Sequence, residues 1–317
     1  MKDKRILITG GAGFIGSNML ELLIPQNEIT VVDNLSNVDR RYIEKYQGNS
    51  NFFFHEGDLA SDSCYRGLGH FDAVIHLAAN SDVKNGANDT SVDMRNNVEA
   101  TFKLLEFMRK EDIGQMLFSS TSTVYGEASL IPTPENYGPY MPISSYGASK
   151  MACEGFITAY SHYYGLRASI FRFANIVGKN STHGVIYDFI RKLNANSSEL
   201  EILGDGTQRK SYLHVNDCVK SMIHIHDRLK KTDIYNLGNT ETTGVNRIAE
   251  IVVSEMGLKN VRMRHTGGIE GRGWKGDVKV AQLEITKMLS SGWKNRFNSD
   301  EAVIEATRET IRQMKVF

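Results

Sequence analysis

A glycine-rich turn, ITGGAGFIGS, joins the apolar run Arg5–Thr9 to a helical pattern, FIGSNMLELL. Its glycines Gly10, Gly13 and Gly16 have the spacing GxxGxxG. Glycines at a strand-to-helix turn permit a tight bend and let backbone N–H groups approach a pyrophosphate at the positive end of the helix. The next strand pattern ends in Asp33, whose carboxylate can bind both hydroxyls of an adenosine ribose and would repel a 2′-phosphate. The pattern therefore predicts a nucleotide-binding turn that prefers NAD to NADP, with a purely structural turn followed by a surface aspartate as the alternative.

Short β-rich runs alternate with helical patterns through the first half of the chain. After RILIT come EITVVD, FFFHE, AVIHLA, QMLFS and ASIFRF, most of them nearly continuous in apolar residues. Such runs are typical of strands that are covered on both faces. They predict an α/β fold, a doubly wound parallel (Rossmann) sheet with a smaller α/β C-terminal domain. The expected boundaries are 1–175 for the NAD-binding domain, completed by 213–238, and 176–212 with 239–317 for a substrate-binding domain.

Apolar periodicity predicts further helices, and capping residues indicate where two of them begin or end. The expected helices are Ser91–Lys110, Val215–Leu229, Asn246–Met256 and Ser299–Met314. Gly257 is expected to end the third of these helices, and Asn298 is expected to cap the N-terminus of the last.

Charge and cysteine content exclude several classes of protein. Among the 317 residues, Lys+Arg and Asp+Glu both number 37, so no bulk charge draws the chain to nucleic acid or to a membrane surface. Cys64, Cys153 and Cys218 lie far apart, which favours reduced thiols over disulfides. His224 and His226 are two apart on an expected helix and point different ways, so we expect no metal site. Without a signal-peptide pattern or a long apolar stretch, the expectation is a cytoplasmic protein.

Two stretches carry side chains suited to acid–base chemistry. SSYGASK places Tyr146 and Lys150 four apart, hence on one face of a helix. A nearby ammonium would lower the phenol pKa from about 10 and make the tyrosine a general acid/base. FSSTSTVYG, Phe118–Gly126, offers a hydroxyl at the end of a strand that could orient a substrate hydroxyl. The alternatives are an ordinary Tyr/Lys pair on a helix surface and an ordinary polar strand end.

These stretches in this order resemble the extended short-chain dehydrogenase/reductase family, the NAD-dependent sugar epimerases and dehydratases. The resemblance extends over essentially the whole chain through EGDLAS, HLAA, RNNVEAT, FRFANIVG, GDGTQRKSYLHV, YNLG and GWKGDV. Within the family, TSTVYGEA, IPTPENYGP and STHGVIYDF are most similar to archaeal-type UDP-glucose 4-epimerases.

The resemblance implies a role for each matching position. It makes Thr121 the hydroxyl of a catalytic triad, Tyr146 its acid/base and Lys150 the partner of the tyrosine. Besides the tyrosine and lysine, the implied cofactor contacts are Gly10, Gly13, Phe14, Ile15, Gly16, Asp33, Asn34, Asp58, Leu59, Leu77, Ala78, Ala79 and Asn97. Besides the threonine and tyrosine, the implied substrate contacts are Asn175, Arg209, Lys210, Arg272, Asp277 and Ala281.

The family's dehydratases carry an Asp-Glu pair just before VYG, whereas this chain has Ser122 and Thr123 there. The resemblance therefore implies NAD-dependent 4-epimerisation of a UDP-hexose through a 4-keto intermediate. A nucleotide-sugar reductase or dehydrogenase is the alternative within enzymes, and a non-catalytic NAD-binding regulator is the alternative outside them. The chain departs from the family where arginines usually hold the diphosphate, because Lys210 and Trp274 occupy those positions.

Two further expectations concern the sugar and the oligomer. At Ala281 a small residue leaves room in the sugar pocket, so we expect UDP-N-acetylhexosamines to be accepted besides UDP-glucose and UDP-galactose. The family also forms homodimers through the helix after Ser91 and the helix of the catalytic tyrosine. Phe156 and Tyr160 are apolar positions available for that contact on the second helix.

Overall fold

The computed structural model describes residues 1–36, 38–80, 88–268 and 278–316. The chain forms two compact units. Unit 1 consists of Met1–Gly126, Gly138–Arg172 and Ser221–Tyr235, and unit 2 of Glu127–Tyr137, Phe173–Lys220 and Asn236–Phe317. This division differs from the expected domains over residues 127–137, 173–175, 213–220 and 236–238, all of which lie in unit 2.

Unit 1 is built on a seven-stranded sheet with the order β11-β6-β5-β4-β1-β2-β3. The strands are β1 Arg5–Thr9, β2 Glu28–Asp33, β3 Phe52–Glu56, β4 Ala73–His76, β5 Gln115–Thr121, β6 Arg167–Phe173 and β11 Asp233–Leu237. Pairing is parallel from β3 through β2, β1 and β4 to β5. The order reverses next to β1, which is the switch point where doubly wound sheets bind ligands. The predicted Rossmann fold is confirmed.

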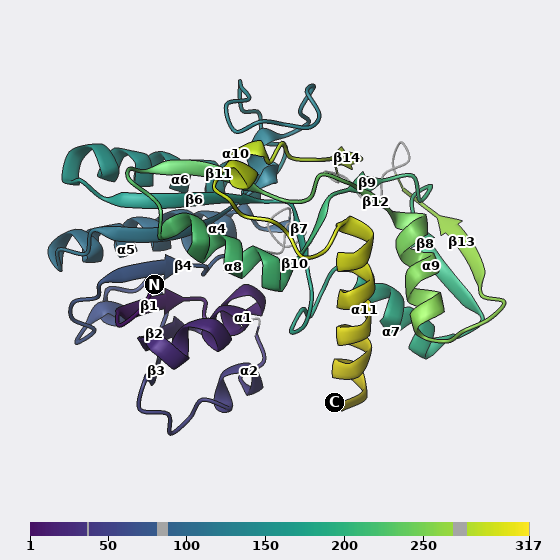
Figure 1. Ribbon diagram of the computed structural model, residues 1–317, viewed down its shortest axis with the longest axis horizontal. Coiled ribbons are helices and arrows are strands. Elements are labelled where there is room, and N and C mark those ends of the chain that lie inside the picture. Colours follow the sequence, from purple (N-terminus) through teal and green to yellow (C-terminus); the bar gives the residue numbers. More distant parts are fainter. Residues whose placement is uncertain (37, 81–87, 269–277, 317) are drawn as a thin grey trace. The chain divides into compact units, whose positions relative to one another are not determined.

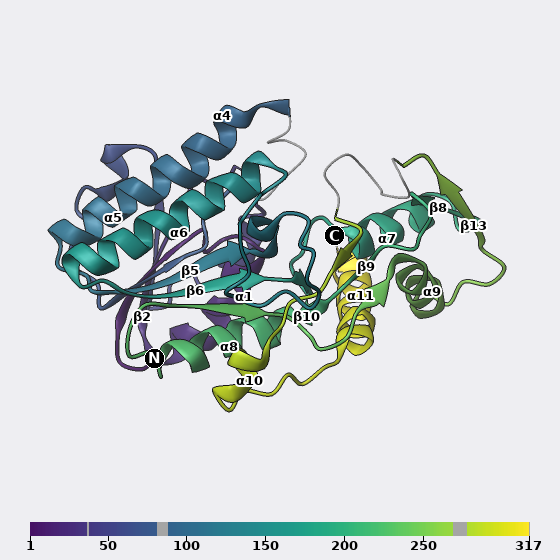
Figure 2. The ribbon, with the colours of Figure 1, turned by 90° about the horizontal axis from the view of Figure 1, so that it is seen from above.

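Helices cover both faces of this sheet. They are α1 Phe14–Leu23, α2 Arg41–Glu44, α4 Thr90–Asp93, α5 Ala100–Lys110, α6 Ser145–Tyr164 and α8 Val215–His226. Figure 2 shows α5 and α6 side by side on one face, with α1 and the end of α8 on the other. Apolar side chains of α5 and α6, such as Leu104 and Ile157, are fully buried in the core below them. This packing of apolar helix faces onto the sheet stabilises unit 1.

The helix expected over Ser91–Lys110 is present but interrupted. Between α4 and α5 the residues Met94–Glu99 form a π-helical turn, which the apolar periodicity did not predict. The wider turn changes the backbone hydrogen bonds, and the Cys153 thiol of α6 donates to the carbonyl oxygen of Asn97 at 3.3 Å. Such turns are rare and are often found at functional sites.

Unit 2 combines three small sheets with helices. The strands are β7 Asn175–Val177, β8 Glu199–Leu203, β9 Arg209–Lys210, β10 Tyr212–His214, β12 Thr243–Gly244, β13 Arg262–Thr266 and β14 Val280–Ala281. They pair as β10-β7, β12-β9-β14 and β13-β8. The helices are α7 Val185–Ala195, α9 Val245–Glu255, α10 Thr286–Ser290 and α11 Ser299–Val316, as Figure 1 shows. Apolar residues of α7, α9 and α11, including Phe189, Val252 and Val303, form a core of their own.

The predicted helix ends are confirmed in unit 2. The Asn298 side chain accepts the N–H of Glu301 at 2.9 Å, and the Glu301 carboxylate accepts the N–H of Asn298 at 2.9 Å, which is a capping box. Gly257 follows α9 with φ of +69°, the left-handed conformation in which glycine ends helices. None of the helices in the described ranges has the length and apolar character that crossing a membrane requires.

Candidate active site

The glycine turn after β1 is packed so closely that side chains are excluded at two of its positions. Gly10 has φ of +68°, and a Cβ there would lie 2.6 Å from the backbone nitrogen of Ala78. A Cβ at Gly16 would lie 2.5 Å from the carbonyl oxygen of Gly10. The predicted residues Leu77 and Ala78, which follow β4, therefore lie against the turn, and Ala79 comes next in the chain. Among the described residues no side chain caps the start of α1, which leaves its first N–H groups, including those of Phe14 and Ile15, suited to an anion.

Asp33 is bound to this turn. It is the last residue of β2, and its carboxylate accepts the backbone N–H of Ala12 at 3.0 Å and that of Leu35 at 3.0 Å. Burial raises the pKa of Asp33, and these backbone hydrogen bonds act against the rise. Asn34 follows directly, and its side chain accepts the N–H of Ser36 at 3.1 Å. The predicted ribose-binding carboxylate thus lies next to the predicted pyrophosphate-binding glycines.

Asp58 and Leu59 lie in the loop after β3, the strand next to β2 in the sheet. Leu59 is buried, and the Asp58 carboxylate accepts the N–H of Ala60 at 2.9 Å. The same carboxylate binds the guanidinium of Arg95 at 2.5 Å. The sequence did not single out Arg95, because an arginine on an expected helix surface carries no motif of its own.

The three predicted catalytic residues lie together in unit 1. Thr121 is the last residue of β5, and its hydroxyl accepts the N–H of Thr123 at 3.2 Å. Tyr146 lies in the first turn of α6, and its phenol is hydrogen-bonded to the Thr121 hydroxyl. Lys150 lies one turn further along α6 and donates from Nζ to the carbonyl oxygen of Ser119 at 2.8 Å. The arrangement offers a hydroxyl, a phenol and a buried ammonium at the carboxyl edge of the sheet, the edge that also carries the glycine turn.

The pKa of Tyr146 differs from what the sequence suggested. Lys150 was expected to lower the pKa, yet burial raises the pKa of Tyr146 to about 12. The hydrogen bond from Thr121 acts against this rise, while the charge of Asp93 adds to it. Burial also lowers the pKa of Lys150 to about 8. Desolvation is the largest cause of the rise and Lys150 is not among its causes, so the lowering expected from the sequence is not seen in this structure.

Asp93 and Asn97 form a buried polar network with α6. Asn97 lies in the π-helical turn, accepts the backbone N–H of Asn80 at 2.8 Å and donates to the Ser149 hydroxyl at 2.8 Å. Asp93 accepts the hydroxyl of Ser145, the residue before Tyr146, at 2.6 Å. Asn97 was predicted to support the cofactor side, and in the structure it supports α6. Asp93 was not predicted, although an acid within a helix expected to pack on the core is a signal that could have identified it.

The predicted substrate residues of unit 2 lie on short strands. Asn175 begins β7, and its amide donates to the Ser211 carbonyl oxygen at 3.4 Å. Lys210 of β9 pairs with Ala281 of β14, so the two share one face of the three-stranded sheet. Arg209 points to the opposite face and donates to the carbonyl oxygen of Thr242 at 3.0 Å. Arg272, Trp274 and Asp277 lie outside the described residues.

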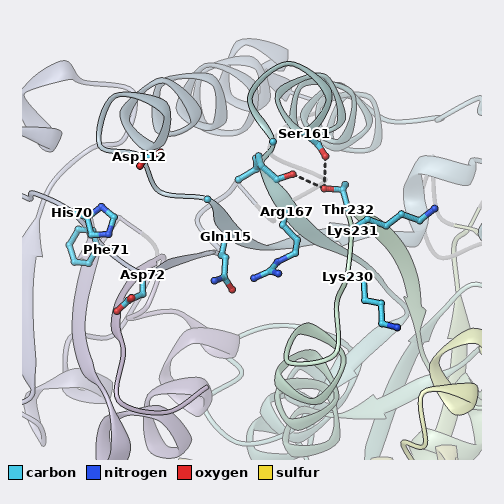
Figure 3. Close-up of a pocket in the computed structure, with 13 residues that line it drawn as sticks. His70, Phe71, Asp72, Asp112, Gln115, Ser161, Arg167, Lys230, Lys231 and Thr232 are labelled. Atoms are coloured by element: carbon cyan, nitrogen blue, oxygen red, sulfur yellow. Dashed lines mark hydrogen bonds between the residues drawn. The ribbon is translucent and has the colours of Figure 1, made fainter.

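A depression of about 630 Å³ lies at the amino ends of strands of the unit 1 sheet. Figure 3 shows the residues that line it. Gln115 and Arg167, the first residues of β5 and β6, line it together with Asp72, which precedes β4. Lysine and aspartate side chains around it carry both signs of charge. The predicted catalytic residues and the glycine turn of unit 1 lie toward the opposite, carboxyl ends of the strands, so this depression is separate from them.

Comparisons with known proteins give matches over most of the chain. A model of the NAD dependent epimerase/dehydratase family matches residues 6–238. A crystal structure of a UDP-galactose 4-epimerase is 38% identical with a TM-score of 0.87, and the match covers 98% of this chain and 99% of that chain. The UDP-N-acetylglucosamine 4-epimerase of Methanobrevibacter ruminantium, in complex with UDP-N-acetylmuramic acid, is 28% identical with a TM-score of 0.89 over 99% of this chain and 100% of that chain. A relative from Methanocaldococcus jannaschii, provisionally named a UDP-glucose 4-epimerase, is 33% identical over 94% of this chain and 95% of its own.

Proposed function

Because this chain belongs to the NAD dependent epimerase/dehydratase family, we propose that it catalyses the NAD-dependent 4-epimerisation of a UDP-hexose through a 4-keto intermediate. The family resemblance drawn from the motifs is confirmed, and the chain is an enzyme, an isomerase of the UDP-glucose 4-epimerase type. One observation supports the proposed reaction above all. Thr121, Tyr146 and Lys150 lie together at the end of the sheet where the glycine turn also lies.

Each of these side chains has a separate task in the proposed reaction. In the proposed reaction Tyr146, as phenolate, removes the proton of the sugar's C4 hydroxyl and returns it after the ring has turned over. The positive ring of bound NAD would favour this form against the effect of burial. The Thr121 hydroxyl, already hydrogen-bonded to the phenol, orients the substrate hydroxyl. The buried ammonium of Lys150 supplies positive charge near the phenolate. Bound NAD would supply the hydride acceptor and donor for C4 of the sugar.

The residues present fit NAD. The backbone atoms around Gly10 and Gly16 approach so closely that a pyrophosphate would meet N–H groups rather than side chains. The Asp33 carboxylate, bound to the same turn, is suited to the ribose hydroxyls. The negative charge of Asp33 would repel the 2′-phosphate that NADP carries on that ribose, which supports a preference for NAD over NADP.

The predicted substrate residues of unit 2 carry groups suited to a nucleotide sugar. Lys210 supplies a positive charge for the diphosphate, and Ala281, its neighbour on the same sheet face, borders the sugar. Asn175 supplies an amide for the diphosphate. Arg209 points to the opposite face of this sheet, so Lys210 is the better candidate of the two neighbouring cations.

A second copy of the chain is the proposed protein partner. Phe102 of α5 and Phe156 of α6 are each 41% exposed, and their rings lie 5.9 Å apart. Met94 is 61% exposed on the π-helical turn that precedes α5. Tyr160 is partly turned inward, since its phenol donates to Glu106 at 2.6 Å. Exposed apolar side chains on two neighbouring helices are suited to the helical dimer interface expected from the sequence.

We also propose a cytoplasmic location. Cys64, Cys153 and Cys218 are buried free thiols, a state that persists in a reducing compartment.

The reaction is tested by incubating the purified protein, without added cofactor, with UDP-glucose, UDP-galactose and their N-acetyl forms. NMR is used to detect the C4 epimer of each sugar. We expect epimers to form and NAD to be released when the purified protein is denatured, because the cofactor is regenerated in each turnover. Consumption of added NAD or NADH in proportion to product would instead indicate a dehydrogenase or reductase. Absence of any product with all four sugars would contradict the proposal.

A further inference from the structure

Three consecutive residues at the end of β5 each contact α6. The Ser119 carbonyl oxygen accepts from Lys150, and the Thr121 hydroxyl is hydrogen-bonded to Tyr146. Between them, the Ser120 hydroxyl donates to the carboxylate of Glu154, which lies one turn beyond Lys150. The catalytic contacts are therefore separated along β5 by one contact that involves no catalytic residue.

Glu154 is one half of a buried ion pair. Arg172 of β6 donates from Nη2 to Oε2 at 2.6 Å and from Nε to Oε1 at 3.0 Å. Both side chains are almost completely inaccessible to solvent. Two buried charges cost more free energy than they return unless their geometry and their remaining hydrogen bonds are good. Here the pair is bidentate, and the Ser120 hydroxyl gives Oε1 a further donor.

The guanidinium of Arg172 also lies over two tyrosine rings. Its central carbon lies 4.7 Å from the ring centre of Tyr125 and 4.8 Å from that of Tyr140. Its Nη1 also donates to the Tyr140 phenol at 3.2 Å. Tyr125 belongs to the short helical turn that directly follows Thr121. The arginine thus holds the segments on both sides of the catalytic threonine, through Tyr125 on one side and through Glu154 and Ser120 on the other.

We infer that Glu154, locked by Arg172 and joined to β5 through Ser120, is a positioning residue that sets the placement of Thr121 against Tyr146. This inference rests on the proposed function, because the placement of Thr121 against Tyr146 affects turnover only in that reaction. Glu154 acts through its neighbours, since it contacts Ser120 and Arg172 rather than the reacting groups. A helix held to a strand at a single point can rotate or slide, whereas contacts one turn apart on α6 fix both movements.

The inference is tested by Ser120→Ala, which removes the link from β5 and leaves the ion pair of Glu154 and Arg172 in place. The matched control is Ser169→Ala. Ser169 is also a completely buried strand serine of unit 1, but its hydroxyl is bonded to His226 at 2.7 Å and not to α6. Both variants lose one buried hydroxyl, so a purely structural role predicts similar losses of stability and no difference in turnover.

We expect Ser120→Ala to lower kcat by about 10-fold to 10²-fold with KM nearly unchanged, because small misplacements of reacting groups act on the transition state. Ser169→Ala should keep the kcat of the unaltered protein. Equal kcat values for the two folded variants would overturn the inference.

A second measurement does not depend on turnover. In labelled-tyrosine NMR spectra, the resonance of Tyr146 is identified by its loss in Tyr146→Phe. Ser120→Ala should shift this resonance, because the contact with Thr121 changes, and Ser169→Ala should leave it in place. If the unaltered protein epimerises no sugar, the proposed function fails while this shift still supports the positioning role. An unshifted resonance in folded Ser120→Ala would overturn that role whatever the reaction is.

Discussion

The ammonium of Lys150 lies 2.8 Å from the backbone carbonyl oxygen of Ser119. It also lies 4.7 Å from the ring centre of Phe118, and the side chain is 2% exposed. One of its three N–H groups is thus bound to the end of β5, and the others can bind a ligand. Burial lowers the pKa of Lys150 to about 8, so the protein keeps this charge at neutral pH at a cost in stability.

Lys150→Met should therefore change how stability depends on pH. The folded-state pKa of Lys150, about 8, lies below the unfolded value of 10.5. Above pH 10.5 the lysine is neutral in both states and does not affect the free energy of unfolding. Between pH 10.5 and 8 the unfolded state binds the proton while the folded state does not. The folded state therefore loses stability as the pH falls through this range. Relative to the unaltered protein, the variant should gain up to about 3 kcal/mol of unfolding free energy between pH 10.5 and 7.

Denaturant unfolding at several pH values measures this difference, and taking the difference cancels the titration of groups that the two proteins share. A difference in unfolding free energy that stays constant across this pH range would mean that the pKa of Lys150 is not lowered in the folded protein. The same variant should also lose turnover, since it lacks the charge beside the phenol.

Tyr146→Phe should abolish most turnover and leave NAD bound. The phenol moves the proton, and its loss costs about 10²–10⁴-fold in kcat for a general acid/base. The glycine turn and Asp33, which are proposed to hold NAD, are untouched by the change. Turnover by NMR and the NAD content of the purified variant check the two parts separately. Activity like that of the unaltered protein would remove Tyr146 from the mechanism.

Most of the sheet and the triad could be predicted from the sequence because their signals are local. Runs such as QMLFS alternate with helical patterns at short intervals, and the strands observed at these runs differ from them by only a few residues at their ends. Tyr146 and Lys150 are four apart, which is enough to place them on one helix face. The turn around Gly10 could be predicted because glycine is the residue that tolerates both the positive φ at this position and the close contact with Ala78.

The supporting network was missed because its members lie far apart in the chain. Ser120, Glu154 and Arg172 come from three different elements, and no periodicity links them. A signal was nevertheless present, since Arg172 interrupts the apolar run ASIFRF, and a charge in a buried strand needs a partner. The pKa of Tyr146 could not be predicted from the spacing to Lys150, because the spacing says nothing of how deeply the phenol is desolvated.

Asp33→Ala should weaken NAD binding and reduce the preference for NAD over NADP. The change removes the charge, and it also leaves the N–H groups of Ala12 and Leu35 without their acceptor. Asp33→Asn is the comparison variant, because its amide oxygen can still accept one of these two N–H groups while the negative charge is lost. We expect both variants to bind NADP better relative to NAD, and Asp33→Ala to lower the melting temperature more than Asp33→Asn. Equal affinity for NAD and NADP in the unaltered protein would refute the role of Asp33.

Phe156→Arg should convert the proposed homodimer into a monomer. A charged side chain placed in an apolar contact between helices must be desolvated without a partner. Phe53→Arg is the control, since Phe53 of β3 is similarly exposed, at 49% against 41%, but lies on a strand at the edge of the sheet. Sedimentation at micromolar concentration should show a dimer for the unaltered protein and the control. A dimer of Phe156→Arg, or a monomer of the unaltered protein, would count against the interface.

The last prediction concerns the sugar. Ala281 shares a sheet face with Lys210, the proposed diphosphate contact. In the proposed complex its small side chain would leave room for a group on C2 of the sugar. We therefore expect the enzyme to epimerise UDP-N-acetylhexosamines as well as UDP-glucose and UDP-galactose. Ala281→Tyr should fill this space and suppress the N-acetyl substrates far more than UDP-galactose, since a tyrosine ring would overlap the acetyl group.

Val280→Tyr provides the matched control for this change. Val280 precedes Ala281 on β14 but pairs with Arg209, so its side chain points to the opposite face of the sheet. The ratio of kcat/KM for the N-acetyl and unmodified sugars should fall about 10-fold or more in Ala281→Tyr and stay unchanged in Val280→Tyr, because crowding by a whole ring exceeds the effect of a single methylene. An unaltered protein that rejects N-acetyl sugars, or an Ala281→Tyr variant that loses both sugar classes equally, would show that another residue borders C2.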